Sequence, residues 1–227
     1  MQTVANAQYN VARSGSLPVR IAAHQRQKMY QAFLDAMAPG APDSILDVGV
    51  TSDRTYSHSN YLELWYPFKD RVTACGLDDA SFLESDFPGM RYVKADGRSL
   101  PFESGSYDFV HSSAVLEHVG NRANQIAFIS ELWRVAKRGI FVTTPNRWFP
   151  VEFHTVLPLV HWLPAGMFRA IMRRTGRSFF AQEENLNLLG PNDIKDIAAA
   201  AGASPARVGH VTLGLWPTNL LLIGHKS

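Results

Sequence analysis

The sequence predicts an α/β protein with a doubly wound, mostly parallel sheet and an antiparallel pair of strands at its C-terminal end. From residue 44 onward, short apolar runs alternate with helical patterns. This alternation is typical of parallel strands with helices on both faces of the sheet. Near the end of the chain, only a short loop containing Trp216 and Pro217 separates two strand patterns, so we expect them to pair antiparallel.

The expected elements follow from apolar run lengths, helical spacing and chain-breaking residues. The expected strands are residues 45–48, 71–77, 90–94, 106–112, 138–144, 206–213 and 218–224. The expected helices are residues 19–37, 57–65, a short segment after Asp79, 122–137 and 192–201.

Particular residues set the ends of these elements. Residues 1–18 are polar and aperiodic, and we expect them to form a loosely held arm. Gly49 marks a tight turn after the first strand, where the absence of a Cβ allows a close approach. Pro67 and Pro145 end a helix and a strand, and Gly202 is a C-cap.

The helix over residues 122–137 has the clearest pattern. One face of it is apolar and is made by Ile126, Ile129, Leu132, Trp133 and Ala136. We see no internal repeat and no shift in composition, so we predict one domain over residues 1–227. Its parts are an N-terminal arm and helix (1–43), a core that carries the ligand site (44–145), an inserted cap (146–190), and a last helix with the hairpin (191–227).

Composition excludes several classes of function. The net charge of +2 gives no field that would indicate nucleic-acid binding. The single cysteine, Cys75, cannot form an internal disulfide, and no N-terminal pattern resembles a signal peptide, so we expect a cytoplasmic location. The apolar stretch 148–172 is interrupted by charges and prolines and cannot span a bilayer. No cysteine or histidine set has metal-ligand spacing, so the sequence predicts no metal.

Four polar side chains follow four successive strands at one edge of the expected sheet: Asp47, Asp78, Asp96 and Ser112. Open α/β sheets bind their ligands just beyond the carboxyl ends of the strands. A carboxylate after the second strand suits the two hydroxyls of a ribose, and Asp96 could accept from the exocyclic amine of an adenine. Singly, each aspartate is more often a solvated loop residue or a helix cap. Together they favour a binding site.

Three motifs carry a resemblance to a known family. They are Asp47-Val-Gly49, Gly76-Leu-Asp78, and the run from Lys94 (KADGRSLPF) through Ser106 (SYDFVHSSAVLEH). The chain resembles class I S-adenosylmethionine-dependent methyltransferases, most closely the small type 11 subgroup. The resemblance covers about residues 44–146 and implies a Rossmann-like, seven-stranded methyltransferase fold. Its implied cofactor is S-adenosylmethionine, which leaves as S-adenosylhomocysteine.

The resemblance also implies roles for individual residues. The implied cofactor-binding residues are Asp47, Gly49, Val50, Leu77, Asp78, Asp79, Asp96, Gly97 and Ser112. His118 occupies the Leu-Glu-His position near the reaction centre. One departure concerns the first loop, where similar enzymes carry two or three glycines and this chain has only Gly49 before Val50, Thr51 and Ser52. The hydroxyls of Thr51 and Ser52 could replace some backbone contacts.

Histidine is the natural general base near neutral pH. We predict His118 and His154 as catalytic, whereas His111 lies inside a strand pattern and is expected to be a core residue. Capping or packing explains His118 about as well as catalysis does, whereas His154 lies in the inserted segment and could face the substrate.

The segment 146–190 leaves the sheet at the edge of the expected site, and its aromatic and proline-rich composition suits a flap over an acceptor pocket. We predict Asn146, Arg147, Trp148 and His154 as substrate residues. An equally weighted interpretation is a capping subdomain whose aromatic side chains only pack on the sheet. A third uses the arginines and apolar bulk of residues 146–177 for peripheral contact with a membrane.

The sequence therefore predicts a methyltransferase that acts on oxygen or nitrogen of a small-molecule or carrier- or lipid-linked acceptor. Two other functions compete. A non-catalytic binding protein on a degenerate methyltransferase fold would explain the single-glycine loop. A nicotinamide-dependent oxidoreductase should show Gly-x-Gly-x-x-Gly, which this turn lacks. The oligomeric state stays open.

Overall fold

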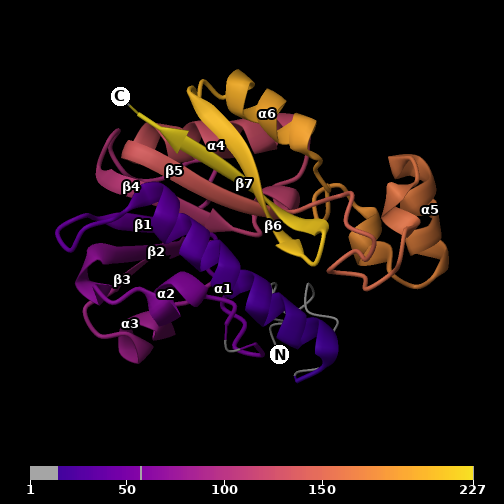
Figure 1. Ribbon diagram of the computed structural model, residues 1–227, viewed down its shortest axis with the longest axis horizontal. Coiled ribbons are helices and arrows are strands. Elements are labelled where there is room, and N and C mark those ends of the chain that lie inside the picture. The colour runs from indigo at the N-terminus through magenta and orange to yellow at the C-terminus, as the bar shows by residue number, and fades with distance from the viewer. Residues whose placement is uncertain (1–14, 57, 227) are drawn as a thin grey trace.

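Seven strands in the described part of the chain, residues 15–56 and 58–226 of a computed structural model, form one sheet (Figure 1). Their order across the sheet is β3-β2-β1-β4-β5-β7-β6. The strands are β1 (Ile45–Val48), β2 (Val72–Gly76), β3 (Arg91–Lys94), β4 (Tyr107–Ser113), β5 (Ala136–Pro145), β6 (Ala206–Leu213) and β7 (Trp216–His225). Strands β1 to β5 run parallel, and β7 pairs antiparallel with both β5 and β6. The predicted fold class is confirmed. Most of the arm expected over residues 1–18 lies outside the described residues.

The helices cover both faces of this sheet. They are α1 (Leu17–Met37), α2 (Tyr61–Trp65), α3 (Phe82–Asp86), α4 (Arg122–Val135), α5 (Ala165–Arg174) and α6 (Pro191–Ala200). In Figure 1, α4 and α6 lie on one face, whereas α1, α2 and α3 lie on the other. Short 3-10 turns occur at η2 (Lys69–Arg71), η3 (Leu116–His118), η4 (Val160–Trp162) and η5 (Ser178–Ala181).

Two predicted boundaries differ from the structure because strand pairing takes precedence over local pattern. The helix expected to reach residue 137 ends at Val135, since Ala136 already pairs with Tyr107 at the start of β5. The last strand begins at Trp216 rather than at residue 218, which shortens the hairpin loop. Pro217 lacks an N–H, and the register shift opposite it in β6 makes it tolerable in this strand.

Alternation along the strands divides the buried side chains between two layers. Leu46 and Val48 of β1 pack with α4 and α6, whereas Ile45 packs with α1 and α2. The same alternation applies to β4, where Val110 belongs to the first layer and Phe109 to the second. Because Asp47 follows Ile45 by two residues, its side chain must lie on the α1 and α2 side of the sheet.

The segment between β5 and α6 contains α5 and has an apolar cluster of its own. That cluster is made by Phe168, Met172, Phe180, Ala181 and Leu186. Figure 1 shows α5 to one side of the sheet, beyond the β6–β7 hairpin. One arginine of the segment, Arg169, forms an ion pair with Glu183 at 3.4 Å. Among the described residues, no helix combines the length and the apolar composition needed to cross a membrane.

Candidate active site

A cavity of about 510 Å³ lies at the carboxyl ends of the parallel strands. Loops after β1, β2, β3 and β4 form most of its wall, α1 contributes Arg26, and the segment after β5 contributes His154. This is the position at which open α/β sheets bind their ligands. Of the predicted site residues, those that line it are Gly49, Val50, Leu77, Asp96, Gly97, His118 and His154.

The turn after β1 is held closely against β2. The amides of Gly49 and Val50 both donate to the carbonyl oxygen of Cys75, at 2.7 and 3.1 Å. Gly49 has a φ of +102°, and a Cβ added there would lie 2.1 Å from the side chain of Val115. A Cβ on Gly76 would lie 2.7 Å from the carbonyl oxygen of Val50. These glycines are therefore required by the close approach of two loops.

The rest of the first loop is fixed by a side chain rather than by further glycines. Asn60 accepts from the amide of Thr51 at 2.9 Å and donates to the Thr51 carbonyl oxygen at 3.0 Å. The Thr51 hydroxyl accepts from the amide of Asp53 at 3.1 Å. The Asn60 contacts give this loop a defined path in the absence of a second glycine.

Past β3, the cavity has a narrow apolar wall. A Cβ on Gly97 would lie 2.4 Å from the ring of Phe128 and 2.9 Å from Val48. Beside it, Arg98 forks onto the carboxylate of Asp96, with Nη2 at 2.6 Å from Oδ2 and Nε at 3.0 Å from Oδ1. The Arg98 guanidinium lowers the pKa of Asp96, which is therefore ionised at neutral pH.

Asp47 does not line the cavity. Its Oδ1 lies 2.7 Å from Nδ1 of His111, and Nε2 of that ring lies 2.9 Å from the hydroxyl of Tyr61. Burial raises the pKa of Asp47 to about 7 and lowers that of His111 to about 4. Glu63 of α2 is buried in the same cluster, and burial together with Asp47 raises its pKa well above the usual value. Strand alternation explains this placement, and His111 is the core residue that the sequence predicts.

Three other predicted cofactor residues also lie outside the cavity lining. Ser112 is fully buried and its hydroxyl donates to the Val48 carbonyl oxygen at 2.7 Å, whereas the next residue, Ser113, lines the cavity. Asp79 accepts from the amide of Ser81 at 2.9 Å, as a turn-forming aspartate does. The Asp78 carbonyl oxygen accepts from the hydroxyl of Tyr92.

Of the four predicted substrate residues, only His154 reaches the cavity. Asn146 donates to the Pro217 carbonyl oxygen at 3.0 Å and accepts from the amide of Trp148 at 3.1 Å. Arg147 donates to the Leu163 carbonyl oxygen at 3.1 Å. Asn146 and Arg147 thus hold the inserted segment to β7 and to itself.

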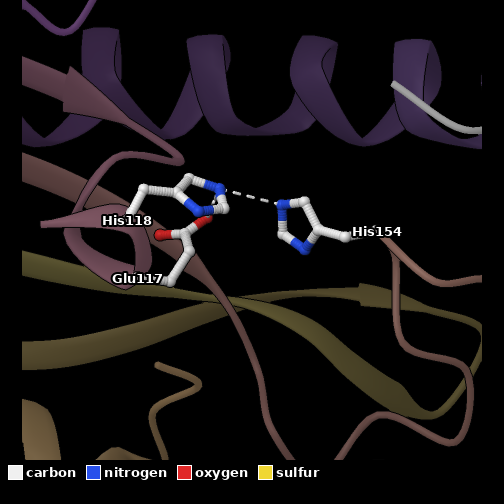
Figure 2. Close-up of side chains that lie close together, drawn as sticks. All are labelled: Glu117, His118 and His154. Carbon is white, nitrogen blue, oxygen red and sulfur yellow. Dashed lines mark hydrogen bonds and ion pairs between the residues drawn. The ribbon is translucent and has the colours of Figure 1, made fainter. Parts of the chain in front are cut away.

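Two histidines from distant parts of the chain meet at the cavity wall (Figure 2). Nε2 of His118 in η3 lies 3.0 Å from Nε2 of His154. On the opposite side of each ring, His118 Nδ1 donates to the Asn185 carbonyl oxygen at 2.6 Å, and His154 Nδ1 donates to Glu152 Oε1 at 2.7 Å. Both Nε2 lone pairs are thereby directed toward one another, and this arrangement is favourable only when a cation lies between them.

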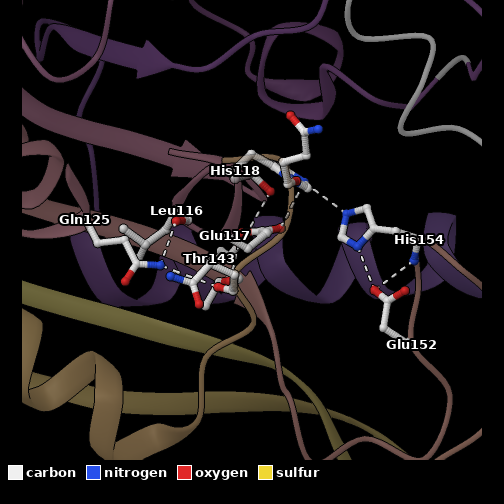
Figure 3. A network of polar contacts seen from close by, with 11 residues as sticks. Leu116, Glu117, His118, Gln125, Thr143, Glu152 and His154 are labelled. Atoms are coloured by element: carbon white, nitrogen blue, oxygen red, sulfur yellow. Dashed lines mark hydrogen bonds and ion pairs between the residues drawn. The ribbon is translucent and has the colours of Figure 1, made fainter. Parts of the chain in front are cut away.

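Glu117 is the third member of this group, and sequence analysis missed it. Its side chain is fully buried, Oε2 accepts from the Thr144 hydroxyl at 2.8 Å, and Oε1 lies 3.7 Å from His118 Nε2. Figure 3 shows this network, in which Gln125 of α4 donates to the carbonyl oxygen of Leu116 and so supports η3. The adjacency of Glu117 and His118 was visible in the sequence, but a 3-10 turn that directs both side chains to one place was not.

The electrostatics of the two imidazoles differ. Burial and His154 lower the pKa of His118 to about 3. Although burial opposes it, the carboxylates of Glu152 and Glu117 raise the pKa of His154. His154 and the amide hydrogen bonds of residues 154 and 155 hold the pKa of Glu152 at about 2. A proton bound to the pair therefore resides on His154.

Comparisons with known proteins agree with the fold and with the family resemblance of the sequence. Residues 46–143 match a family model described as a methyltransferase domain. No sequence among the curated proteins matches the chain.

Solved structures share the fold at low sequence identity. A SAM-dependent methyltransferase from Thermotoga maritima has a TM-score of 0.59 at 13% identity, over 93% of this chain and 92% of that one. Magnesium protoporphyrin IX methyltransferase from Synechocystis, with bound SAH, has a TM-score of 0.56 at 18% identity, over 98% and 92%. The CurJ carbon methyltransferase has a TM-score of 0.60 at 11% identity, over 93% and 55%. The match places a methyltransferase domain at residues 46–143, and the chain shares the fold of S-adenosylmethionine-dependent class I methyltransferases, the family that its sequence motifs resemble.

Proposed function

We propose that the enzyme transfers a methyl group to an oxygen or nitrogen atom of a small-molecule or carrier- or lipid-linked acceptor. The observation that carries this proposal is the position of the His118–His154 pair on the wall of the cavity. Carbon acceptors occur among proteins of this fold, as the CurJ enzyme shows, but an imidazole pair is best suited to an acceptor that carries an acidic O–H or N–H.

The position and the lining of the cavity support the cofactor site. Gly49, Gly76 and Gly97 line the cavity, and because a Cβ at each would collide with a neighbouring loop or ring, these glycines let the loops pack closely around it. We assign the turn at Gly49 and Val50 to the amino-acid end of the cofactor. The apolar wall of Gly97 and Phe128, beside Asp96, suits the adenine ring.

When bound, the cofactor supplies a methyl group already activated by a sulfonium, so the chain contributes mainly alignment. The turn at Gly49 and Val50, with Asp96, would hold the cofactor so that its methyl group could pass to the acceptor atom, with the electron pair of the broken carbon–sulfur bond left on sulfur. The proton lost by the acceptor would be held between the two Nε2 atoms of His118 and His154. Glu152 would then stabilise the imidazolium through Nδ1 of His154.

The inserted segment supports an acceptor with an apolar portion. Several of its large apolar side chains are exposed, namely Trp148, Val151, Val156, Leu159, Trp162 and Met167. Arg173 and Arg174 lie at the end of α5 on the same segment. This combination favours a carrier- or lipid-linked acceptor over a wholly polar metabolite. A reducing cytoplasm would suit the single, buried thiol of Cys75.

Calorimetry with S-adenosylhomocysteine tests the assignment of the cofactor site. Asp96→Ala should weaken binding about 10-fold or more, because a hydrogen bond to a charged group is lost. Asp86→Ala, which removes a comparable exposed ion pair with Arg54, is the matched control. Equal affinity of the two variants for S-adenosylhomocysteine would show that Asp96 does not contribute to cofactor binding.

Turnover against panels of hydroxyl, amine, thiol and activated-carbon acceptors tests the reaction itself. We expect product with a hydroxyl or amine acceptor, and loss of turnover in His154→Asn with unchanged cofactor affinity. Methylation of only thiols or carbon by the wild type would contradict the proposal. A folded chain that binds the cofactor but methylates no acceptor would favour the binding-protein alternative.

A further inference from the structure

We propose that Glu117, His118 and His154 form a binding site for a divalent transition-metal ion, of which zinc is the representative probe. The site consists of His118 Nε2, His154 Nε2 and a carboxylate oxygen of Glu117, and these atoms lie within 4.8 Å of one another. Two imidazoles and one carboxylate form the protein ligand set of many catalytic zinc sites. The proposal concerns the same site as the proposed function, but metal binding does not depend on methyl transfer.

The distances suit a shared ion. Nitrogen ligands about 2.0–2.1 Å from zinc lie roughly 2.9–3.4 Å apart for bond angles between 90° and tetrahedral. The two Nε2 atoms are 3.0 Å apart. Glu117 Oε1 is 3.7 Å from His118 Nε2, and the three ligand atoms lie within 4.8 Å of one another, so the carboxylate would move toward the imidazole pair to complete the set.

The outer hydrogen bonds are those that orient metal ligands. A metal-bound histidine usually donates its other ring N–H to a carboxylate or a backbone carbonyl oxygen, which fixes the tautomer and the ring orientation. Here His154 donates to the Glu152 carboxylate, and His118 donates to the Asn185 carbonyl oxygen. Glu117 is likewise oriented, through the Thr144 hydroxyl on Oε2.

Charge and burial also favour a cation of charge two. Glu117 and Glu152 are both buried, and in the described residues neither forms an ion pair with lysine or arginine. Oε1 of Glu117 is a buried oxygen without a hydrogen-bond partner among those residues, and it lies beside the two imidazoles. A buried carboxylate oxygen is costly to leave unpaired. One divalent ion would satisfy this oxygen and balance both carboxylates.

The exposed side of this site is the cavity, which His118 and His154 line. A hydroxyl group of the acceptor could therefore occupy an open position on the ion and would lose its proton more readily there. The ion would then replace the shared proton of the imidazole pair. This acceptor role rests on the proposed function, whereas the presence of the site does not.

The experiment is titration of chelator-treated full-length chain with Zn²⁺ by calorimetry and with Co²⁺ by visible absorption, without cofactor. We expect one tight site in the wild type. His118→Asn, His154→Asn and Glu117→Gln should weaken it by at least about 100-fold, and Glu152→Gln by about 10- to 100-fold. His210→Asn, which changes an exposed histidine on β6, is the matched control and should bind as the wild type does.

Absence of Zn²⁺ and Co²⁺ binding by folded wild type, or equal affinity in all variants, would overturn the site. If a histidine variant fails to fold, Glu117→Gln and Glu152→Gln give the same test. S-adenosylhomocysteine binding by each variant separates the two proposals. A variant that no longer binds the metal ion but keeps its affinity for S-adenosylhomocysteine supports the metal site. A metal-loaded chain that binds cofactor and methylates no hydroxyl would refute only the acceptor role.

Discussion

Glu63→Gln should change the pH dependence of stability in a direction opposite to that expected for the loss of an ion-paired carboxylate. Glu63 is fully buried on α2, and its carboxyl group interacts with that of Asp47. Asp47 and His111 lie in the same cluster, Tyr61 precedes Glu63 by two residues on α2, and Lys69 donates to the Glu63 carbonyl oxygen. Burial, and then Asp47, raise the pKa of Glu63 well above 4.5, so the folded chain keeps this proton over a pH range in which the unfolded chain has lost it.

The sign follows from proton linkage. Above pH 4.5 the unfolded chain has released the Glu63 proton and the folded chain has not, so folding takes up a proton. Its stabilising effect is full below pH 4.5 and is lost as pH rises toward the folded pKa. One proton corresponds to at most about 1.4 kcal/mol per pH unit, over the range between the unfolded and the folded pKa. Glutamine has no proton to release, so with rising pH the variant should gain stability relative to wild type by up to that amount per pH unit.

Denaturant unfolding at pH 5, 6 and 7 measures this difference. In thermal unfolding, each kcal/mol of this gain should appear as a rise of about 2–4 °C in the Tm of the variant relative to wild type between pH 5 and pH 7. Glu103→Gln, at an exposed turn, is the control, and its curve should run parallel to wild type. Parallel curves for Glu63→Gln would refute the reasoning, because Glu63 would then titrate at the same pKa in the folded and unfolded chains.

Three further predictions concern the cavity and the inserted segment. Asn60→Ala removes both hydrogen bonds to Thr51, so we expect the free energy of unfolding to fall by about 1–3 kcal/mol and S-adenosylhomocysteine to bind more weakly. Denaturant unfolding and calorimetry measure these two effects. Unchanged affinity would mean that cofactor binding does not depend on the path of this loop. Gly97→Ala puts a Cβ 2.4 Å from the ring of Phe128, so destabilisation of about 1–3 kcal/mol and reduced cofactor affinity are expected, and a fully stable variant would contradict that close contact. Met172→Ala leaves a cavity in the apolar cluster around α5 and should lower the stability of that segment by about 2–5 kcal/mol. Limited proteolysis should then cut the segment faster than wild type, while unaltered cleavage would show that the cluster does not stabilise it.

Much of the fold could be predicted from local pattern, because strand and helix periodicities are written directly into the order of residues. All seven strands occur close to their predicted positions, and the antiparallel C-terminal pair was foreseeable from the shortness of its connection. Several cavity residues were also foreseeable, including Gly49, Asp96 and Gly97, because the carboxyl ends of parallel strands meet at one edge. The boundaries near Ala136 and Trp216 were not, since strand pairing decided them.

Tertiary structure alone decided which polar groups face the cavity. Asp47 alternates with its neighbours along β1, and only the packing of α1 and α2 determines that its side of the sheet is the closed one. His118 and His154 are 36 residues apart, and no spacing rule joins them. The inserted segment folds back to bring them into contact and adds Glu152 behind one ring and the Asn185 carbonyl oxygen behind the other. The sequence by itself determined the sheet and the edge where ligands bind, because those depend on periodicity. The chemistry at that edge depends on contacts between distant residues, which only the folded chain creates.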